Sequence, residues 1–312
     1  MSRIILYHRQ FALGPKIASG GFATIYRGKQ LSNDEDVAIK ICARHDDPAY
    51  TRSITKEAEL IQRLRHRNIV KLFPIPRKGR ASVYHARAVE LPDHPTFFVM
   101  EYLHGGTLDQ YLNAVGLLSL PEAATIALEV ARALDHIHQK RYAHNDLKLE
   151  NIVFRNPIRA GKPFSPVLVD FGIATKVRLP MAGTMYIKSP EQITSEVRDN
   201  NEAIDSPKVD VWGLGIVLYR MLGGQLPFES RNEKTLTERI RQSRPTSLLK
   251  LSRGVSQEAD ELIIDGCLAK KPNNRITLYQ LGQSLRRLAG KRVVAVKSAE
   301  QADTTKAKWF KR

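Results

Sequence analysis

Apolar and polar residues alternate from 11 to 29, on either side of a run of small residues at 17–25. A period of two predicts two strands joined by a turn at the small residues. Two more strand patterns lie at about 81–91 and 96–102. The intervening segment 48–65 is expected to be a helix with one packed face, because its apolar residues follow a helical spacing. These residues are Ile54, Ala58, Ile61 and Leu64.

Further helical patterns follow along the chain. Residues 119–137 open with a Ser-x-x-Glu capping-box signature before an apolar series, which predicts a long buried helix. The stretch 210–224 is apolar almost all round and is expected to be a helix in the centre of a larger lobe. Amphipathic helices are expected at 256–268 and 277–288. The lysine-rich end, 289–312, is expected to be a basic, mobile tail.

Length and composition narrow the class of protein. At 312 residues the chain exceeds the usual single-domain size, so two lobes or two domains are expected. Cys42 and Cys267 lie far apart without metal-ligand spacing, which argues against a disulfide framework or zinc site and favours a reducing compartment. There is no apolar run of about eighteen residues and no secretory signal. We therefore expect no membrane span and a cytoplasmic location.

The chain is strongly basic, with 49 Lys and Arg against 32 Asp and Glu and a formal net charge of +17. Such an excess can indicate nucleic acid, an anionic membrane or acidic substrates. The basic residues gather at 77–80, at 231–244 and in the tail, but no nucleic-acid-binding motif accompanies them. A solvated basic surface is the preferred interpretation, and no nucleic-acid partner is expected.

The segment 142–154 places chemically committed side chains in a short polar run between apolar residues. Asp146 can accept a proton from a substrate hydroxyl, and Lys148 can neutralise charge on a phosphoryl group. Asn151 can offer its amide oxygen to Mg²⁺. These roles suffice for phosphoryl transfer. Taken alone the window is equally compatible with a solvated loop, so the interpretation depends on further motifs in the right order.

This segment resembles the H-R-D-L-x-x-x-N signature of protein kinases. His144, Asp146 and Asn151 match, and Asn145 stands where the signature has arginine. In the family that arginine couples a phosphate on the activation segment to the catalytic loop through a charged contact. Because asparagine cannot form that ion pair, we expect this chain to be active without such a phosphate.

A second resemblance involves the small residues 17–25, which are similar to the phosphate-covering loop G-x-G-x-x-G-x-V of kinases. Its marked positions are occupied here by Ala18, Gly20, Ala23 and Ile25, so only the middle glycine is present. Glycine permits positive φ and a close approach of backbone N–H groups to phosphates. Alanine therefore carries a cost only where the loop needs that conformation.

The next motif, Val37-Ala-Ile-Lys40, is similar to the kinase strand whose lysine holds the α- and β-phosphates and pairs with a helix glutamate. Glu57 is the preferred partner and Glu59 the competing choice. Further on, residues 99–106 resemble the hinge between two kinase lobes. The resemblance makes Met100 the gatekeeper and brings the backbone of Glu101 and Leu103 to adenine.

The remaining motifs follow in the family order. Val167-Leu-Val-Asp-Phe-Gly172 ends in a carboxylate, Asp170, that the resemblance assigns to Mg²⁺. Residues 183–191 resemble the close of the activation segment, with Ser189 replacing alanine and Thr184 matching a threonine that bonds the catalytic Asp and Lys in serine/threonine kinases. Two structural roles are also implied. They are a bond from Asp210 to the catalytic-loop backbone and a pair between Arg275 and Glu191.

These ordered motifs cover residues from about 12 to 288, and the chain is identified as a member of the eukaryotic-type serine/threonine protein kinases. The resemblance implies an α+β, bilobal fold in a domain over 1–288. Its antiparallel sheet lobe with one helix would take 1–101 and its mostly helical lobe 104–288. The implied cofactors are ATP and Mg²⁺, and the implied partner is a protein with a Ser or Thr acceptor; the oligomeric state stays open. The implied catalytic residues are Asp146, Lys148, Lys40, Glu57 and Thr184, and the metal ligands Asn151 and Asp170. The implied nucleotide-binding residues are Ile17, Ala18, Ser19, Gly20, Gly21, Phe22, Ala23, Thr24, Ile25, Ala38, Lys40, Met100, Glu101, Leu103 and Val153, the last packing under adenine.

Two rival interpretations are weighed against an active protein kinase. A pseudokinase that only binds nucleotide or protein is suggested by Ala18, Ala23 and Asn145. It is disfavoured because the residues that catalysis needs are all present, namely Lys40, Glu57, Asp146, Asn151 and Asp170. A small-molecule kinase is disfavoured by Thr184 and by the Ser-Pro-Glu close, which belong to kinases with protein substrates.

Overall fold

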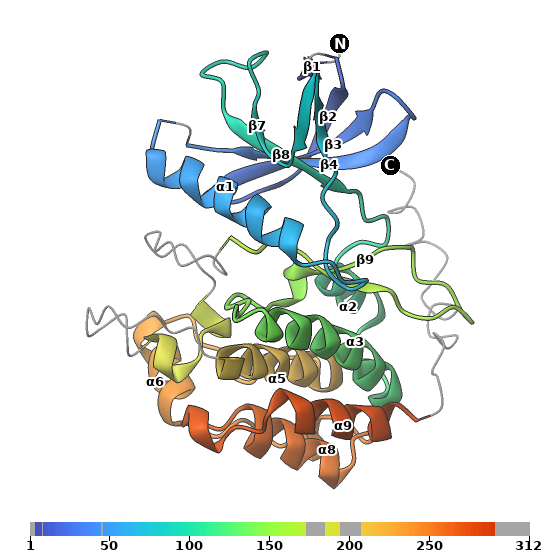
Figure 1. Ribbon diagram of the computed structural model, residues 1–312. Coiled ribbons are helices and arrows are strands. Elements are labelled where there is room, and N and C mark those ends of the chain that lie inside the picture. Colours follow the sequence, from blue (N-terminus) through green and yellow to red (C-terminus); the bar gives the residue numbers. More distant parts are fainter. Residues whose placement is uncertain (1–3, 8, 45, 173–184, 194–206, 291–312) are drawn as a thin grey trace. The chain divides into compact units, whose positions relative to one another are not determined.

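The computed structural model describes residues 4–7, 9–44, 46–172, 185–193 and 207–290 (Figure 1). Contacts divide the chain into two compact units, Met1–Leu103 with Val169–Ala182 and His104–Leu168 with Gly183–Arg312. The segment from Val169 is grouped with the first unit, where Asp170 and Phe171 contact Lys40 and Glu57. The predicted basic tail lies, from residue 291, outside the described residues.

A six-stranded sheet forms the first unit, and each strand is antiparallel to its neighbours. In spatial order its strands are β1 (Ile4–Leu6), β2 (Phe11–Ser19), β3 (Ala23–Gln30), β4 (Glu35–Cys42), β8 (Thr96–Glu101) and β7 (Ala86–Arg87). A packed core on this sheet includes Phe11, Val37, Ile39, Phe97 and Val99, all fully buried. The predicted alternation on either side of residues 17–25 thus becomes the hairpin of β2 and β3.

The predicted strand at 81–91 is wrong as a single element. The structure splits it into β6 (Arg80–Val83), which pairs with β5 (Ile75–Arg77), and β7, which pairs with β8. The chain changes its pairing partner between Val83 and Ala86, so one continuous alternating pattern serves two sheets. The alternation of apolar and polar residues shows which residues share a face of a strand, but it does not show which strand lies beside it.

Helix α1 (Pro48–Arg63) packs on the sheet of the first unit (Figure 1). It starts where its sequence predicts: the Asp47 side chain accepts a hydrogen bond from the Ala49 N–H at 2.8 Å, and Pro48 occupies the first turn. The predicted apolar face is buried, and Glu57 is buried beside it. The Glu57 carboxylate therefore lies against the strands of the sheet, whereas an exposed helix residue would face water.

The second unit is mainly helical. Its helices with described bounds are α2 (Leu108–Val115), α3 (Leu120–Gln139), α5 (Pro207–Gly223), α6 (Glu233–Gln242), α7 (Leu248–Leu251), α8 (Gln257–Glu261) and α9 (Leu278–Ala289). Short 3-10 turns lie at Leu149–Asn151, Met185–Ile187 and Pro272–Asn274, and a π-helical turn at Leu262–Cys267 continues α8. The strands β9 (Ile152–Phe154) and β10 (Pro166–Leu168) form a small antiparallel pair.

Helix α5 packs against α3, and both carry the catalytic segment (Figure 1). The predicted capping box is confirmed: the Ser119 side chain accepts from the Glu122 N–H, while the Glu122 carboxylate accepts from the Ser119 N–H at 3.0 Å. Helix α5 is buried along nearly its whole surface, as its all-round apolar sequence predicts. None of the helices in the described ranges has the length and hydrophobicity that a membrane crossing requires.

Candidate active site

Lys40 lies on β4, flanked in the sheet by Ile25 of β3 and Phe98 of β8. Its Nζ atom is 2.7 and 2.8 Å from the two carboxylate oxygens of Glu57, and 2.9 Å from Oδ1 of Asp170. Both Lys40 and Glu57 are buried, whereas the competing Glu59 is exposed. The helical phase of α1 therefore selects Glu57 as the partner of this lysine.

The environment of Lys40 is electrostatically unusual. Burial by itself disfavours the charged ammonium, but the nearby Asp170 and Glu57 carboxylates outweigh it and raise the pKa of Lys40 above its ordinary value. Glu57 also accepts a hydrogen bond from the Phe171 N–H at 3.2 Å. The result is a fixed cation with one buried partner and a second partner, Asp170, whose side chain is 43% exposed. The Asp170 carboxylate is therefore accessible to a ligand, whereas the Glu57 carboxylate is buried against Lys40.

The small-residue loop connects β2 and β3 through a tight turn in which the Gly20 N–H donates to the Ala23 carbonyl at 2.9 Å. Ala18 pairs with Ile25 just after a shift of register between β2 and β3, and neither Ala18 nor Ala23 has a positive φ. Alanine in place of the family's glycines therefore causes no backbone strain in this conformation. Phe22 packs on Tyr50 of α1, with ring centroids 5.1 Å apart, and the rest of the turn is exposed or half-buried except Ala23.

The residues expected to meet adenine lie along β4 and at the end of β8. Ala38 and Met100 are paired across these strands, and both are buried. The Glu101 N–H donates to the Lys71 carbonyl at 2.9 Å, and the Glu101 carboxylate accepts from the Lys71 N–H. Since its N–H is engaged, Glu101 can offer a base only its carbonyl oxygen. Leu103, two residues further, is half-buried.

The catalytic segment of the second unit brings Asp146, Lys148 and Asn151 together. The Asn151 Nδ2 donates to the backbone carbonyl of Asp146 at 2.9 Å and to its carboxylate at 3.1 Å. The Lys148 Nζ lies 3.2 Å from the same carboxylate. Asp146 is buried, so its carboxylate is held by an amide and a cation in a fixed orientation. Val153 follows on β9, half-buried and paired with Val167.

Asp210, at the start of α5, fixes the backbone of this segment and is fully buried. Its carboxylate accepts hydrogen bonds from the N–H groups of His144 and Asn145, both at 2.8 Å, as the sequence resemblance implies. His138, at the end of α3, adds a third contact through Nε2 at 2.8 Å. A buried carboxylate with three such partners is a rigid support for the loop that carries Asp146.

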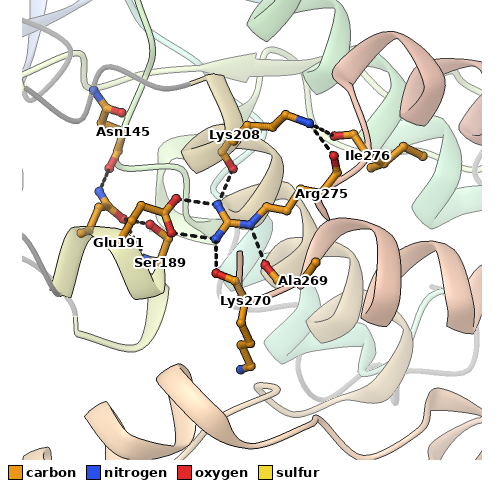
Figure 2. Close-up of polar contacts among 9 residues, drawn as sticks. Asn145, Ser189, Glu191, Lys208, Ala269, Lys270, Arg275 and Ile276 are labelled. Atoms are coloured by element: carbon orange, nitrogen blue, oxygen red, sulfur yellow. Dashed lines mark hydrogen bonds and ion pairs between the residues drawn. The ribbon is translucent and has the colours of Figure 1, made fainter. Parts of the chain in front are cut away.

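The predicted pair of Arg275 and Glu191 is also confirmed. Two guanidinium nitrogens of Arg275 lie 2.6 and 2.7 Å from the two Glu191 oxygens, in the bidentate geometry that makes such pairs strong (Figure 2). Further N–H groups of Arg275 donate to the carbonyls of Lys208 and Ala269. The Arg275 side chain is fully buried, so this network anchors the segment around Glu191 to the helices of the second unit.

Replacing Glu191 with glutamine is expected to lower the free energy of unfolding by about 3 kcal/mol, because it leaves the buried Arg275 guanidinium without its counter-charge. The matched control is Glu258→Gln, which breaks an exposed pair with Arg287 on the same unit and is expected to cost about 0–1 kcal/mol. Urea unfolding of the three proteins measures both values. Equal losses for the two variants would show that burial does not set the strength of the Arg275 pair.

One candidate residue falls outside the described part of the chain, and two residues that support the catalytic segment were not predicted. Thr184 belongs to the range 173–184, which is not described. His138 and Gln192 were missed as supports of the catalytic segment. Gln192 has a signal in the sequence, because Ser189-x-x-Gln192 is a capping-box pattern like that at Ser119. His138 has no comparable local signal.

Comparison with known proteins agrees with these geometries. The model of the protein kinase domain family matches residues 11–285. The serine/threonine-protein kinase PrkC of Bacillus subtilis (strain 168) is 28% identical over 94% of this chain and 41% of its own length. The probable serine/threonine-protein kinase 2 of Plasmodium falciparum (isolate K1 / Thailand) is 28% identical over 89% of this chain and 50% of its own length. The chain thus spans about half or less of these curated relatives.

The family match covers both the strand-rich and the helical unit. It confirms the expected α+β class, with an antiparallel sheet and one helix in one lobe and helices in the other. A family model that spans most of a chain establishes membership, and this chain belongs to the protein kinase domain family.

Proposed function

We propose that this chain transfers the γ-phosphoryl group of Mg-ATP to serine or threonine hydroxyls of protein substrates. The observation that carries the proposal is the buried Lys40–Glu57 pair at 2.7 Å, with Asp170 as its exposed third member at 2.9 Å. Burying an ion pair gains little stability over apolar packing, so such a pair is better explained by chemistry. Asp146, Lys148 and Asn151 of the second unit are proposed to supply the other groups that the reaction needs.

In the first unit, Lys40 is proposed to bind the α- and β-phosphates, and Glu57 to hold its ammonium in place. The turn at Gly20 and Gly21, where both residues are exposed, would cover the phosphates. Asp170 fits a magnesium ligand, because it offers a hard carboxylate oxygen that is 43% exposed. When bound, Mg²⁺ would supply positive charge that offsets the charge of the phosphates.

In the second unit, Asp146 is proposed to orient the substrate hydroxyl and accept its proton. Lys148, already 3.2 Å from that carboxylate, would stabilise charge on the transferred group. The Nδ2 atom of Asn151 is engaged by Asp146, so Oδ1 is its atom for a metal ion. Catalysis by this set is mainly positioning and electrostatics, because phosphoryl transfer demands little covalent help.

Serine and threonine are proposed as acceptors because Thr184 accompanies Asp146 and Lys148 in the sequence, and because the relatives are named serine/threonine kinases. A cytoplasmic location is proposed as well. It is supported by Cys42 and Cys267, both free and buried, which suit a reducing compartment.

The test of the proposed function compares the wild-type chain with Asp170→Ala in a labelled-ATP assay at several Mg²⁺ concentrations. The variant is expected to lose at least about 100-fold in rate, because it lacks a carboxylate for the metal. Asp34→Ala is the matched control, since that carboxylate is exposed on the same unit and pairs only on the surface with Lys29. Transfer that is equal in the wild type and Asp170→Ala, or absent from both, would favour the pseudokinase alternative.

Activity is expected to persist after removal of phosphate from the activation segment. Between Gly172 and Ser189 the hydroxyl residues are Thr175, Thr184 and Tyr186. Tyr186 is half-buried and donates to Glu150 at 3.0 Å, and burial together with that carboxylate raises its pKa above the ordinary value. The measurement is the initial rate before and after phosphatase treatment, with loss of phosphate checked by mass spectrometry. A fall of about tenfold or more, reproduced by Thr175→Ala, would reveal a phosphate switch.

A further inference from the structure

The peptide group that leads into Asp146 has a contact that the proposed reaction does not require. The Gln192 Nε2 donates a hydrogen bond to the Asn145 carbonyl at 3.2 Å, across 47 positions of sequence. That carbonyl belongs to the peptide bond between Asn145 and Asp146. Figure 2 shows the contact reaching Asn145 from the segment that carries Ser189 and Glu191. Gln192 therefore acts on the backbone of the proposed base, not on its carboxylate.

The orientation of the Gln192 amide is fixed by the chemistry of its partners. Its Oε1 accepts from the Ser189 N–H at 2.8 Å and from the Ser189 hydroxyl at 3.1 Å. A backbone N–H can only donate and a backbone carbonyl can only accept, so the amide fits in one way. Its oxygen must face Ser189 and its nitrogen must face Asn145. Ser189 is fully buried, which protects this arrangement from competition by water.

The segment that presents Gln192 is itself anchored. Its neighbour Glu191 makes the bidentate pair with the fully buried Arg275, whose guanidinium also donates to the Lys208 carbonyl at 2.9 Å. The network in Figure 2 thus connects the α5 backbone through Glu191 to the residue before Asp146. Because its backbone is anchored, the Gln192 amide can hold the Asn145 carbonyl in place. A donor on an unanchored loop would instead move with the catalytic segment.

The backbone of Asn145 is held from the other side as well. Its N–H donates to Asp210 at 2.8 Å, and its φ of 63° lies in the left-handed region that asparagine adopts more readily than most residues. Among the described residues, the side-chain oxygen of Asn145 is buried and has no hydrogen-bond partner. The contacts to Asp210 and Gln192 therefore run through the main chain of residue 145.

We propose that Gln192 is a positioning residue that couples the segment 189–192 to Asp146 through the Asn145 carbonyl. This contact is neutral and reaches residue 145 through its main chain, whereas the family's arginine at this position acts through a charged side-chain contact to a phosphate. The inference rests on the proposed function, because it concerns the base of that reaction. It predicts that the rate of transfer, and not the affinity for ATP, depends on the Gln192 amide nitrogen.

Two variants test the role of the Gln192 amide nitrogen. Gln192→Met removes the donor and keeps the side-chain length, while Gln192→Glu keeps an acceptor for Ser189 but places an ionised carboxylate against the carbonyl. Both are expected to lower kcat by about tenfold or more, with the KM for ATP within about twofold of wild type. Matched controls are the same changes at Gln280, whose Oε1 caps α9 through the Thr277 N–H at 3.1 Å and hydroxyl at 2.8 Å. The Gln280 variants are expected to retain the wild-type kcat.

A pH series separates a positioning role from a general loss of structure. When the pH falls from about 7.5 to about 5.5, a growing fraction of the Gln192→Glu carboxyl becomes protonated and can donate to the Asn145 carbonyl. Its rate relative to wild type at the same pH is therefore expected to rise, whereas the ratio for Gln192→Met stays flat. A flat ratio for both variants, or an unchanged kcat, would overturn the inference.

Hydrogen exchange tests the coupling of Gln192 to the catalytic segment without depending on phosphoryl transfer. Backbone amides of 144–148 are expected to exchange faster in Gln192→Met than in Gln280→Met. If the wild-type chain transfers no phosphate, the proposed function fails, yet faster exchange would still support the coupling of Gln192 to this segment. Unchanged exchange would overturn the coupling even in an active enzyme.

Discussion

Lys40→Met is expected to lower the rate of phosphoryl transfer by about 100- to 1,000-fold and to weaken ATP binding. Methionine nearly preserves the length of the side chain but removes the cation that lies 2.7 Å from Glu57 and 2.9 Å from Asp170. The phosphates of the nucleotide would then meet two carboxylates without a compensating positive charge. Repulsion accounts for the loss of affinity, and the misplaced phosphates account for the loss of rate.

The control for this variant is Lys29→Met on β3. Lys29 also pairs with carboxylates, those of Asp34 and Asp36, but its side chain is 35% exposed. It is expected to keep the wild-type rate and ATP affinity. Steady-state kinetics and a nucleotide titration measure both quantities, and circular dichroism checks the fold. Wild-type activity in Lys40→Met would remove the central lysine from the mechanism.

Asp146→Asn is expected to lower the rate by about 100- to 10,000-fold while leaving ATP affinity nearly unchanged. The asparagine has the same shape, and the bond from Asn151 to the backbone carbonyl of residue 146 does not depend on the carboxylate. The change removes the carboxylate that is proposed to accept the hydroxyl proton and that pairs with Lys148 at 3.2 Å. Chemistry therefore suffers while nucleotide binding does not.

Asp135→Asn is a suitable control, because Asp135 lies exposed on α3 and accepts only a surface hydrogen bond from Gln139 among the described contacts. It is expected to leave kcat and KM unchanged. In addition, Asp146→Asn is expected to bind ATP with nearly the affinity of the wild type. A variant that lost both binding and rate would indicate a role in folding or nucleotide binding instead of proton transfer.

Local patterns predicted the elements whose stability is local. The capping box at Ser119, the apolar face of α1 and the all-round apolar α5 follow from short-range spacing, and each is present. Strand β1 and the division of 81–91 into β6 and β7 were not predicted, because they depend on which strand lies alongside. The π-helical turn at Leu262–Cys267 was likewise read as ordinary helix, since its apolar spacing does not reveal an extra residue per turn.

The candidate site depended on resemblance more than on pattern. Spacing selected Glu57 over Glu59, and the structure pairs Glu57 with Lys40. No rule of spacing joins Lys40 to Asp170, which are 130 positions apart, or Gln192 to Asn145. Such contacts arise from the tertiary fold, so the sequence analysis did not predict them. The spacing of Ser189 and Gln192 could have predicted their local contact, but not the hydrogen bond from Gln192 to Asn145.

Phosphosite mapping on products of the pure wild-type chain tests the central claim most directly. The protein is incubated with labelled ATP and Mg²⁺, alone and with a protein lysate whose own kinases have been inactivated, and the products are analysed by mass spectrometry. The account expects phosphate on serine and threonine hydroxyls, dependent on Mg²⁺ and absent with Asp146→Asn. Phosphate confined to tyrosine would contradict the acceptor class. No transfer at all, from a folded chain that binds ATP, would contradict the kinase reaction itself.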